Sequence, residues 1–159
     1  MSAIESARQR RRLIATVKDS LRAMNNQLSL LNRHVSRRIE LKDVDLDCLD
    51  LIDRHGPLSP GALAKRAGLH PATMTGVLDR LQRAGWITRD RDPDGTDRRA
   101  VAVRVLRGRG GEIYRLYAGM NGSLDEICAG YSDTELAVVA DFLHRTTNAG
   151  RAATDALAD

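Results

Sequence analysis

Residues 58–86 read LSPGALAKRAGLHPATMTGVLDRLQRAGW and predict two short helices joined by a tight turn. Capping and helix-breaking residues mark the expected helix ends, namely Ser59 with Pro60, Gly68, His70 with Pro71, and Gly85. The shared apolar core is expected from Leu63, Ala67, Met74, Leu78 and Leu81. Two helices around a short glycine-containing turn are typical of a helix-turn-helix, although a purely structural helical hairpin would use the same turn.

The following residues, WITRDRDPDGTDRRAVAVRVL at 86–106, predict a β-hairpin. Trp86–Arg91 and Arg99–Leu106 have strand-like composition, and the segment between them contains the turn residues Pro93 and Gly95. A helix-turn-helix that leads directly into a basic hairpin predicts a winged helix. The arginines of this wing are Arg89, Arg91, Arg98, Arg99 and Arg104.

The N-terminal part of the chain predicts a long helix over residues 5–40, because no glycine or proline precedes Gly56. At 1.5 Å per residue this helix is roughly 50 Å long, which favours pairing with another helix, partly in a second subunit. A helix packed within its own domain would show the same periodicity. A shorter helix is expected at 44–55. The apolar seam of the long helix repeats in steps of three and four at Ile14, Val17, Leu21, Met24, Leu28, Leu31 and Val35.

After the wing, residues 107–130 predict one helix that is weakened by glycines and is therefore a candidate for movement. Ser132 and Glu135 have the spacing of a capping box, which starts a last helix expected to run to about Asn148 and to be followed by a frayed helical tail. The resulting fold is mainly α-helical with a small β-hairpin wing. Its expected divisions are a dimerisation helix at 1–40, a winged helix-turn-helix lobe at 41–106 and C-terminal dimerisation helices at 107–159.

Charge is unevenly distributed along the 159 residues. Residues 1–41 and 63–109 each carry a net charge of +6, whereas residues 42–62 carry −3 and residues 110–159 carry −5. A basic arm and a basic middle favour a polyanion partner, although a solvated surface of uneven charge is an alternative. Aromatic residues are only 3% of the chain, which argues against stacking platforms for single-stranded nucleic acid.

Several other classes of function have no support in the sequence. No apolar run is long enough for a transmembrane span, and the N-terminus has no secretory signal, so a cytoplasmic protein is expected. The four scattered histidines show no metal-binding spacing, and neither a phosphate-binding loop nor a hydrolase motif is present. We therefore expect no enzyme activity, no cofactor and no metal.

The order of elements resembles the MarR family of transcriptional regulators over almost the whole chain. The similarity is sharpest at 58–106, where Asp97-Arg98-Arg99 matches the D-x-R signature of the wing and Asp79-Arg80-Leu81 matches the D-R-L of the recognition helix. The resemblance implies a homodimer whose two winged lobes bind successive grooves of a pseudo-palindromic double-stranded operator. It also implies a repressor and a small-molecule pocket, commonly for aromatic acids or phenols, between the dimerisation helices and the DNA lobe.

The expected DNA contacts lie on the second helix of the helix-turn-helix and at the tip of the wing. Threonines there suit phosphates or base edges, an alanine suits a thymine methyl group, and wing arginines suit the minor groove. Gly76 and Pro71 depart from the family pattern, which predicts fewer direct contacts between this helix and the base edges. Asp97 is expected to orient an arginine rather than to touch DNA. The predicted DNA-binding residues are Ala72, Thr73, Thr75, Gly76, Arg80, Arg98 and Arg99.

The candidate effector pocket consists of Leu28, Leu31, His34, Cys48 and Ile52, for each of which an ordinary core role is the alternative. Neighbouring carboxylates predict that Cys48 and Cys128 are buried, unreactive thiols. Two alternative functions remain open. The first is a redox-sensing repressor that uses one of these cysteines, and the second is a winged-helix scaffold that binds proteins and ignores DNA.

Overall fold

The computed structural model describes residues 3–91 and 101–158 of the chain. It divides into two compact units, of which the first ends at Glu112 and the second begins at Ile113. Within the described residues, no helix combines the length and the apolar character needed to cross a membrane. The functional division at residues 40 and 106 stays a prediction.

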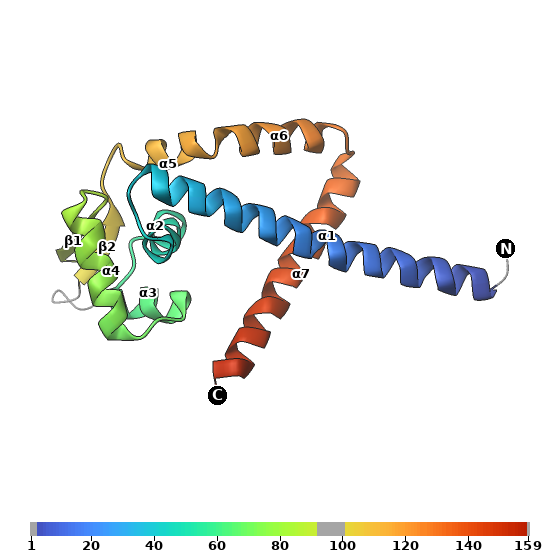
Figure 1. Cartoon of the computed structure of the whole chain (residues 1–159), viewed down its shortest axis with the longest axis horizontal. Coiled ribbons are helices and arrows are strands. Elements are labelled where there is room, and N and C mark those ends of the chain that lie inside the picture. The colour runs from blue at the N-terminus through green and yellow to red at the C-terminus, as the bar shows by residue number, and fades with distance from the viewer. Residues whose placement is uncertain (1–2, 92–100, 159) are drawn as a thin grey trace. The chain divides into compact units, whose positions relative to one another are not determined.

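The first unit begins with the long helix α1, Ala3–Arg38, which leads into a lobe formed by α2–α4 and a hairpin (Figure 1). The predicted length of this helix is confirmed. None of the described side chains before Val35 is buried, and the seam residues Ile14, Val17 and Met24 are 42–46% exposed. The helix therefore packs on its own lobe only through its C-terminal end.

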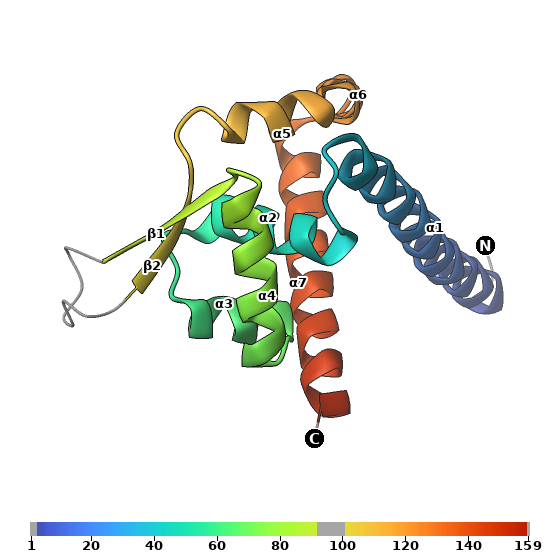
Figure 2. The ribbon, with the colours of Figure 1, turned by 60° about the vertical axis from the view of Figure 1, so that its left-hand side comes forward.

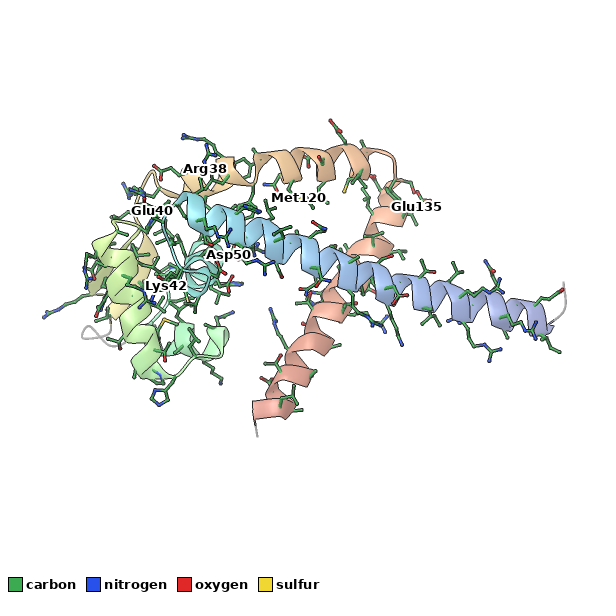
Figure 3. The ribbon with its side chains drawn as sticks, viewed as in Figure 1. Arg38, Glu40, Lys42, Asp50, Met120 and Glu135 are labelled. Carbon is green, nitrogen blue, oxygen red and sulfur yellow. The ribbon has the colours of Figure 1, made fainter. Side chains whose placement is uncertain are left out.

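The junction between α1 and α2 is closed by local hydrogen bonds. Glu40 adopts a left-handed φ of 57°, and the N–H of Leu41 donates to the carbonyl of Ser36 at 2.9 Å. The buried Ser36 hydroxyl also donates to Asp43, the first residue of α2, Asp43–His55. The hydrogen bonds of Ser36 to Leu41 and Asp43 set the direction in which α2 leaves α1. Figure 3 labels Arg38, Glu40 and Lys42 at this junction, and Asp50 further along α2.

Helices α3, Pro60–Ala67, and α4, Pro71–Arg83, pack against α2 and against each other. Strands β1, Ile87–Arg91, and β2, Val101–Val105, form the antiparallel hairpin that extends beside α4 in Figure 2. Leu58 pairs with Val103 through hydrogen bonds of 3.1 and 2.7 Å, which ties the start of α3 to β2. The core of the lobe includes Leu49, Ile52, Leu63, Met74, Leu78, Leu81, Ile87 and Val103.

The C-terminal part corrects two expectations. The single helix predicted at 107–130 is interrupted at Tyr117 into α5, Gly110–Leu116, and α6, Ala118–Ala129, because Tyr117, with φ −96° and ψ 1°, leaves the α-helical conformation. The last helix, α7, runs from Asp133 to Ala158 and not to about Asn148. Its final turns are rich in alanine, which has the highest helix propensity and outweighs the single Gly150. The capping box of Ser132 and Glu135 is confirmed, since each accepts from the other's backbone N–H.

Candidate nucleic-acid interface

The predicted capping pattern of the helix-turn-helix is confirmed at each end. The Ser59 hydroxyl accepts from the N–H of Ala62 at 3.1 Å, and the Nδ1 atom of His70 accepts from the N–H of Ala72 at 3.2 Å. Gly68 has a φ of 64°, and its N–H donates to the last turn of α3. Only glycine adopts this left-handed conformation at little cost. These local bonds fix the angle at which α4 follows α3.

Helix α4 has one buried face and one exposed face. Met74, Val77, Leu78 and Leu81 are buried in the lobe. Of the predicted DNA contacts, Ala72, Thr73 and Thr75 are exposed, whereas Gly76 and Arg80 are half-buried. The hydroxyl of Thr75 donates to the carbonyl of Pro71 at 3.1 Å, so its oxygen is oriented as an acceptor. The structure thus brings five of the seven predicted contacts onto the same helix.

Arg80 is engaged inside the lobe. Its Nε donates to Asp45 Oδ2 at 2.8 Å and its Nη2 donates to Asp45 Oδ1 at 2.6 Å, which makes a bidentate pair between α4 and α2. Asp45 is 1% exposed, and its hydrogen bonds raise the pKa of Arg80. A Cβ added to Gly76 would meet Arg80 Nη1 at 3.4 Å, so the guanidinium lies along the glycine. Arg80 therefore orients α4, and its DNA contact stays a prediction.

Two arginines of the hairpin are also paired with carboxylates. Arg89 on β1 donates to Asp79 on α4, and Arg104 Nε on β2 lies 3.8 Å from Asp90 Oδ2 on β1. Asp90 is diagonal to Arg104, which pairs directly with Thr88 in the strand register. Cross-strand pairs of opposite charge hold a hairpin in register. The Arg89–Asp79 pair attaches the base of the wing to the recognition helix, and the Arg104–Asp90 pair joins the two strands of the wing.

The last attachment joins the hairpin to α5. The Arg109 guanidinium lies 3.9 Å from the ring centroid of Trp86, and its Nε is 3.2 Å from Glu112 Oε2. The N–H of Leu106 donates to the Trp86 carbonyl at 2.9 Å. Trp86 is buried, so the segment after the wing is anchored on the core of the lobe.

The wing tip itself lies outside the described residues. The predicted contacts Arg98 and Arg99, and Asp97 as the residue that orients them, fall within 92–100 and stay predictions. Asp45 and Arg89 are interface-building residues that the sequence reasoning did not assign. Helix α2 contains several aspartates, and no local sequence signal distinguishes Asp45, whose carboxylate is buried, from the others.

The candidate effector residues do not share the cavity that the described residues form between α2 and α3. Cys48 and Ile52 are buried, Leu28 and Leu31 are half-buried, and His34 is exposed. A cavity of about 330 Å³ between α2 and α3 is lined by Cys48 but by none of the other four. The effector pocket predicted from these five residues stays a prediction.

The two cysteines differ in their surroundings. Cys48 is fully buried, and burial, followed by the charges of Asp47 and Asp45, raises its pKa to about 11. The prediction that this thiol is buried is confirmed there, and its lack of reactivity stays a prediction. Cys128 is exposed, and the prediction that it is buried is wrong, because α6 buries none of its side chains within the chain. Within 3–91 and 101–158, no three His, Cys, Asp or Glu side chains are grouped as metal ligands.

This geometry defines the class of winged helix-turn-helix proteins, in which the second helix of the pair, here α4, exposes one face. The MarR family model matches residues 41–101. The uncharacterized HTH-type transcriptional regulator YcgE of Bacillus subtilis is 27% identical over 139 residues, or 87% of this chain and 89% of that protein. An uncharacterized HTH-type transcriptional regulator of Mycobacterium leprae is 30% identical over 104 residues, or 61% of this chain and 71% of that protein.

The fold is also found among solved structures. FabT of Streptococcus pneumoniae, solved in complex with DNA, matches with a TM-score of 0.62 at 24% identity, over 85% of this chain and 95% of FabT. This likeness shows a common fold. Together with the family match and the relatives, it confirms the predicted winged-helix architecture. The chain belongs to the MarR family of transcriptional regulators.

Proposed function

We propose that this regulator binds a pseudo-palindromic DNA operator as a homodimer and represses transcription until a small molecule releases it. The observation that carries the proposal is the exposed face of α4, with Ala72, Thr73 and Thr75, on a helix that the Asp45–Arg80 pair orients. FabT, which has the same fold, was solved with DNA. A short polar helix face of this kind suits the major groove.

Charge supports the same interface. Residues 63–109 carry 11 basic and 5 acidic side chains. Arg83, at the end of α4, is exposed and has no carboxylate partner among the described residues. Such a cation suits a DNA phosphate, which would strengthen binding in a salt-dependent way. Arg80 and Arg89, by contrast, form ion pairs with Asp45 and Asp79 inside the lobe, and these pairs orient α4 and the hairpin.

Dimerisation is supported by apolar surface that one chain leaves uncovered. Ile14, Val17 and Met24 are exposed along one side of α1. Helix α7 exposes a second set, Val138, Val139, Phe142 and Leu143. Exposed apolar patches of this extent are typical of interaction surfaces. A second copy of the chain is the partner that would cover them.

The test of DNA binding is fluorescence anisotropy with the purified full chain, its own upstream DNA and a scrambled duplex, titrated against salt. We expect selective binding, with a steep loss of affinity as salt rises. Thr73→Ala and the double change Arg98→Ala with Arg99→Ala should each weaken binding. Arg22→Ala on α1, where Arg22 pairs with exposed Asp19, is the matched control and should leave binding unchanged. Equal, weak binding to both duplexes would contradict the proposal and favour the scaffold alternative.

The dimer is tested separately by light scattering. Val17→Glu puts a charge on the exposed seam and should shift the chain towards monomer. Asn26→Glu, on the opposite side of the same helix, is the control and should remain dimeric. A parent chain that is monomeric at micromolar concentration would contradict the homodimer.

A redox-sensing repressor is the second candidate, and the exposure of Cys128 favours it. The experiment compares DNA binding of the parent and of Cys128→Ser before and after peroxide treatment. Loss of binding in the parent alone would support this candidate. Unchanged binding in both would exclude it and leave release by a ligand.

A further inference from the structure

The cavity between α2 and α3 has no assigned role. Its volume is about 330 Å³, which is at the lower end of the range for ligand pockets and suits a small metabolite. Val44, Leu51, Ala67 and Leu69 supply apolar lining, and the fully buried thiol of Cys48 also lines it. No hydrogen-bond partner of this thiol occurs within the described part of the chain. The cavity is open to solvent, and its lining combines these apolar side chains with polar and charged ones.

Three charged side chains line the same cavity, namely Asp47, Asp50 and Arg66. Asp50, labelled in Figure 3, pairs with Arg54, with 2.9 Å between Arg54 Nε and Asp50 Oδ1. Asp47 on α2 and Arg66 on α3 have no ion-pair partner among the described residues. Burial, followed by the charges of Asp43 and Asp50, raises the pKa of Asp47. Asp47 and Arg66, which are both exposed to solvent, are therefore one charge of each sign at the cavity that has no ion pair within the described residues.

We propose that this cavity binds a small zwitterion with an apolar side chain, such as an aliphatic α-amino acid, whose ammonium pairs with Asp47 and whose carboxylate pairs with Arg66. The side chain then lies against Val44, Leu51 and Leu69. The role of this ligand as the effector of the regulator rests on the proposed function, whereas its binding to the cavity does not.

A ligand of a single charge suits the cavity less well. A simple amine would satisfy Asp47 and would leave Arg66 facing a second cation. A simple carboxylate would satisfy Arg66 and would bring a third anion to Asp47 and Asp50. Only a molecule with both charges pairs with both helices, and arginine is the side chain best suited to a carboxylate because its guanidinium offers parallel donors.

The experiment is isothermal titration calorimetry of the full chain, without DNA, against millimolar L-leucine and L-methionine. Isoamylamine and isocaproate, which are leucine without its carboxylate and without its amine, are the matched ligands. We expect saturable binding of at least one amino acid, with one ligand per chain. Each single-charge analogue should bind roughly tenfold more weakly or not at all, since a charge-assisted contact is lost.

Protein variants supply the second arm. Asp47→Asn and Arg66→Gln should each lower amino acid affinity roughly tenfold, and Lys65→Gln, the exposed neighbour that does not line the cavity, should not change it. Circular dichroism confirms that each variant is folded. Absence of saturable binding with both amino acids overturns the proposal, as does isoamylamine or isocaproate binding as tightly as leucine, or affinity unchanged in both variants. Because DNA is absent, failure here leaves operator binding intact, and failure of operator binding leaves this titration intact.

Discussion

Asp45 and Arg80, which are 35 positions apart, form a bidentate ion pair that joins α2 to the recognition helix α4. The carboxylate is almost completely buried, whereas 35% of the arginine side chain is exposed. The pair leaves Arg80 little freedom to turn towards DNA. Its consequence is a recognition helix whose orientation depends on an acidic residue outside the helix-turn-helix.

Removing either partner should destabilise the chain, but unequally. Arg80→Ala leaves a buried, unpaired carboxylate and is expected to lower the free energy of unfolding by about 3 kcal/mol. Asp45→Ala frees an arginine that can turn to water, so a loss of about 1 to 2 kcal/mol is expected. Urea unfolding followed by circular dichroism measures both. The double variant should lose less than the sum of the two, and a larger loss for Asp45→Ala than for Arg80→Ala would contradict this account.

Trp86 gives a direct readout of the anchor after the wing, because it is the only tryptophan in the chain. Arg109→Met removes the cation above its ring and should lower the free energy of unfolding by about 0.5 to 1 kcal/mol. The ring should become more accessible, so its emission should shift to longer wavelength. Arg107→Met, an exposed neighbour, is the control. An unchanged emission maximum in Arg109→Met would show that the cation does not anchor this segment.

Cys48 should resist labelling in the folded chain. With a pKa of about 11, roughly one Cys48 thiol in a thousand is ionised at about pH 8, and the thiol is also buried. In a Cys128→Ser background, a thiol-specific disulfide reagent should therefore react only after unfolding by denaturant. Rapid reaction of the native variant would refute the buried position of Cys48.

Asp47 should make stability depend on pH. Its pKa is raised above the ordinary 3.8 by burial first and then by Asp43 and Asp50, so the folded chain binds this proton more tightly than the unfolded chain. The contribution of Asp47 to stability is present below about pH 3.8 and is lost as the pH rises through the raised value. Asp47→Asn should consequently be more stable than the parent at neutral pH, by a few tenths of a kcal/mol because the site is partly solvated. The difference should vanish in acid, and a less stable variant at neutral pH would contradict the assignment.

The helix ends of the lobe were predictable from sequence because their signals are local. Ser59, Gly68 and His70 cap or end a helix through bonds to residues within four positions. The apolar residues Met74, Leu78 and Leu81, which recur at helical steps of four and three, predicted the buried face of α4 in the same way. The break at Tyr117 and the length of α7 escaped prediction because glycine and alanine propensities are weak and act over the whole helix.

Sequence alone established the winged helix and its family, since spacing, caps and charge lie within short stretches of chain. Tertiary packing decided which charges remain available to a ligand. Asp45 turns inward to Arg80, while Asp47, two residues later on the same helix, is exposed and lines the same cavity as Arg66. Nothing local separates these two carboxylates, because the difference arises from what α3 and α4 bring to each side of α2.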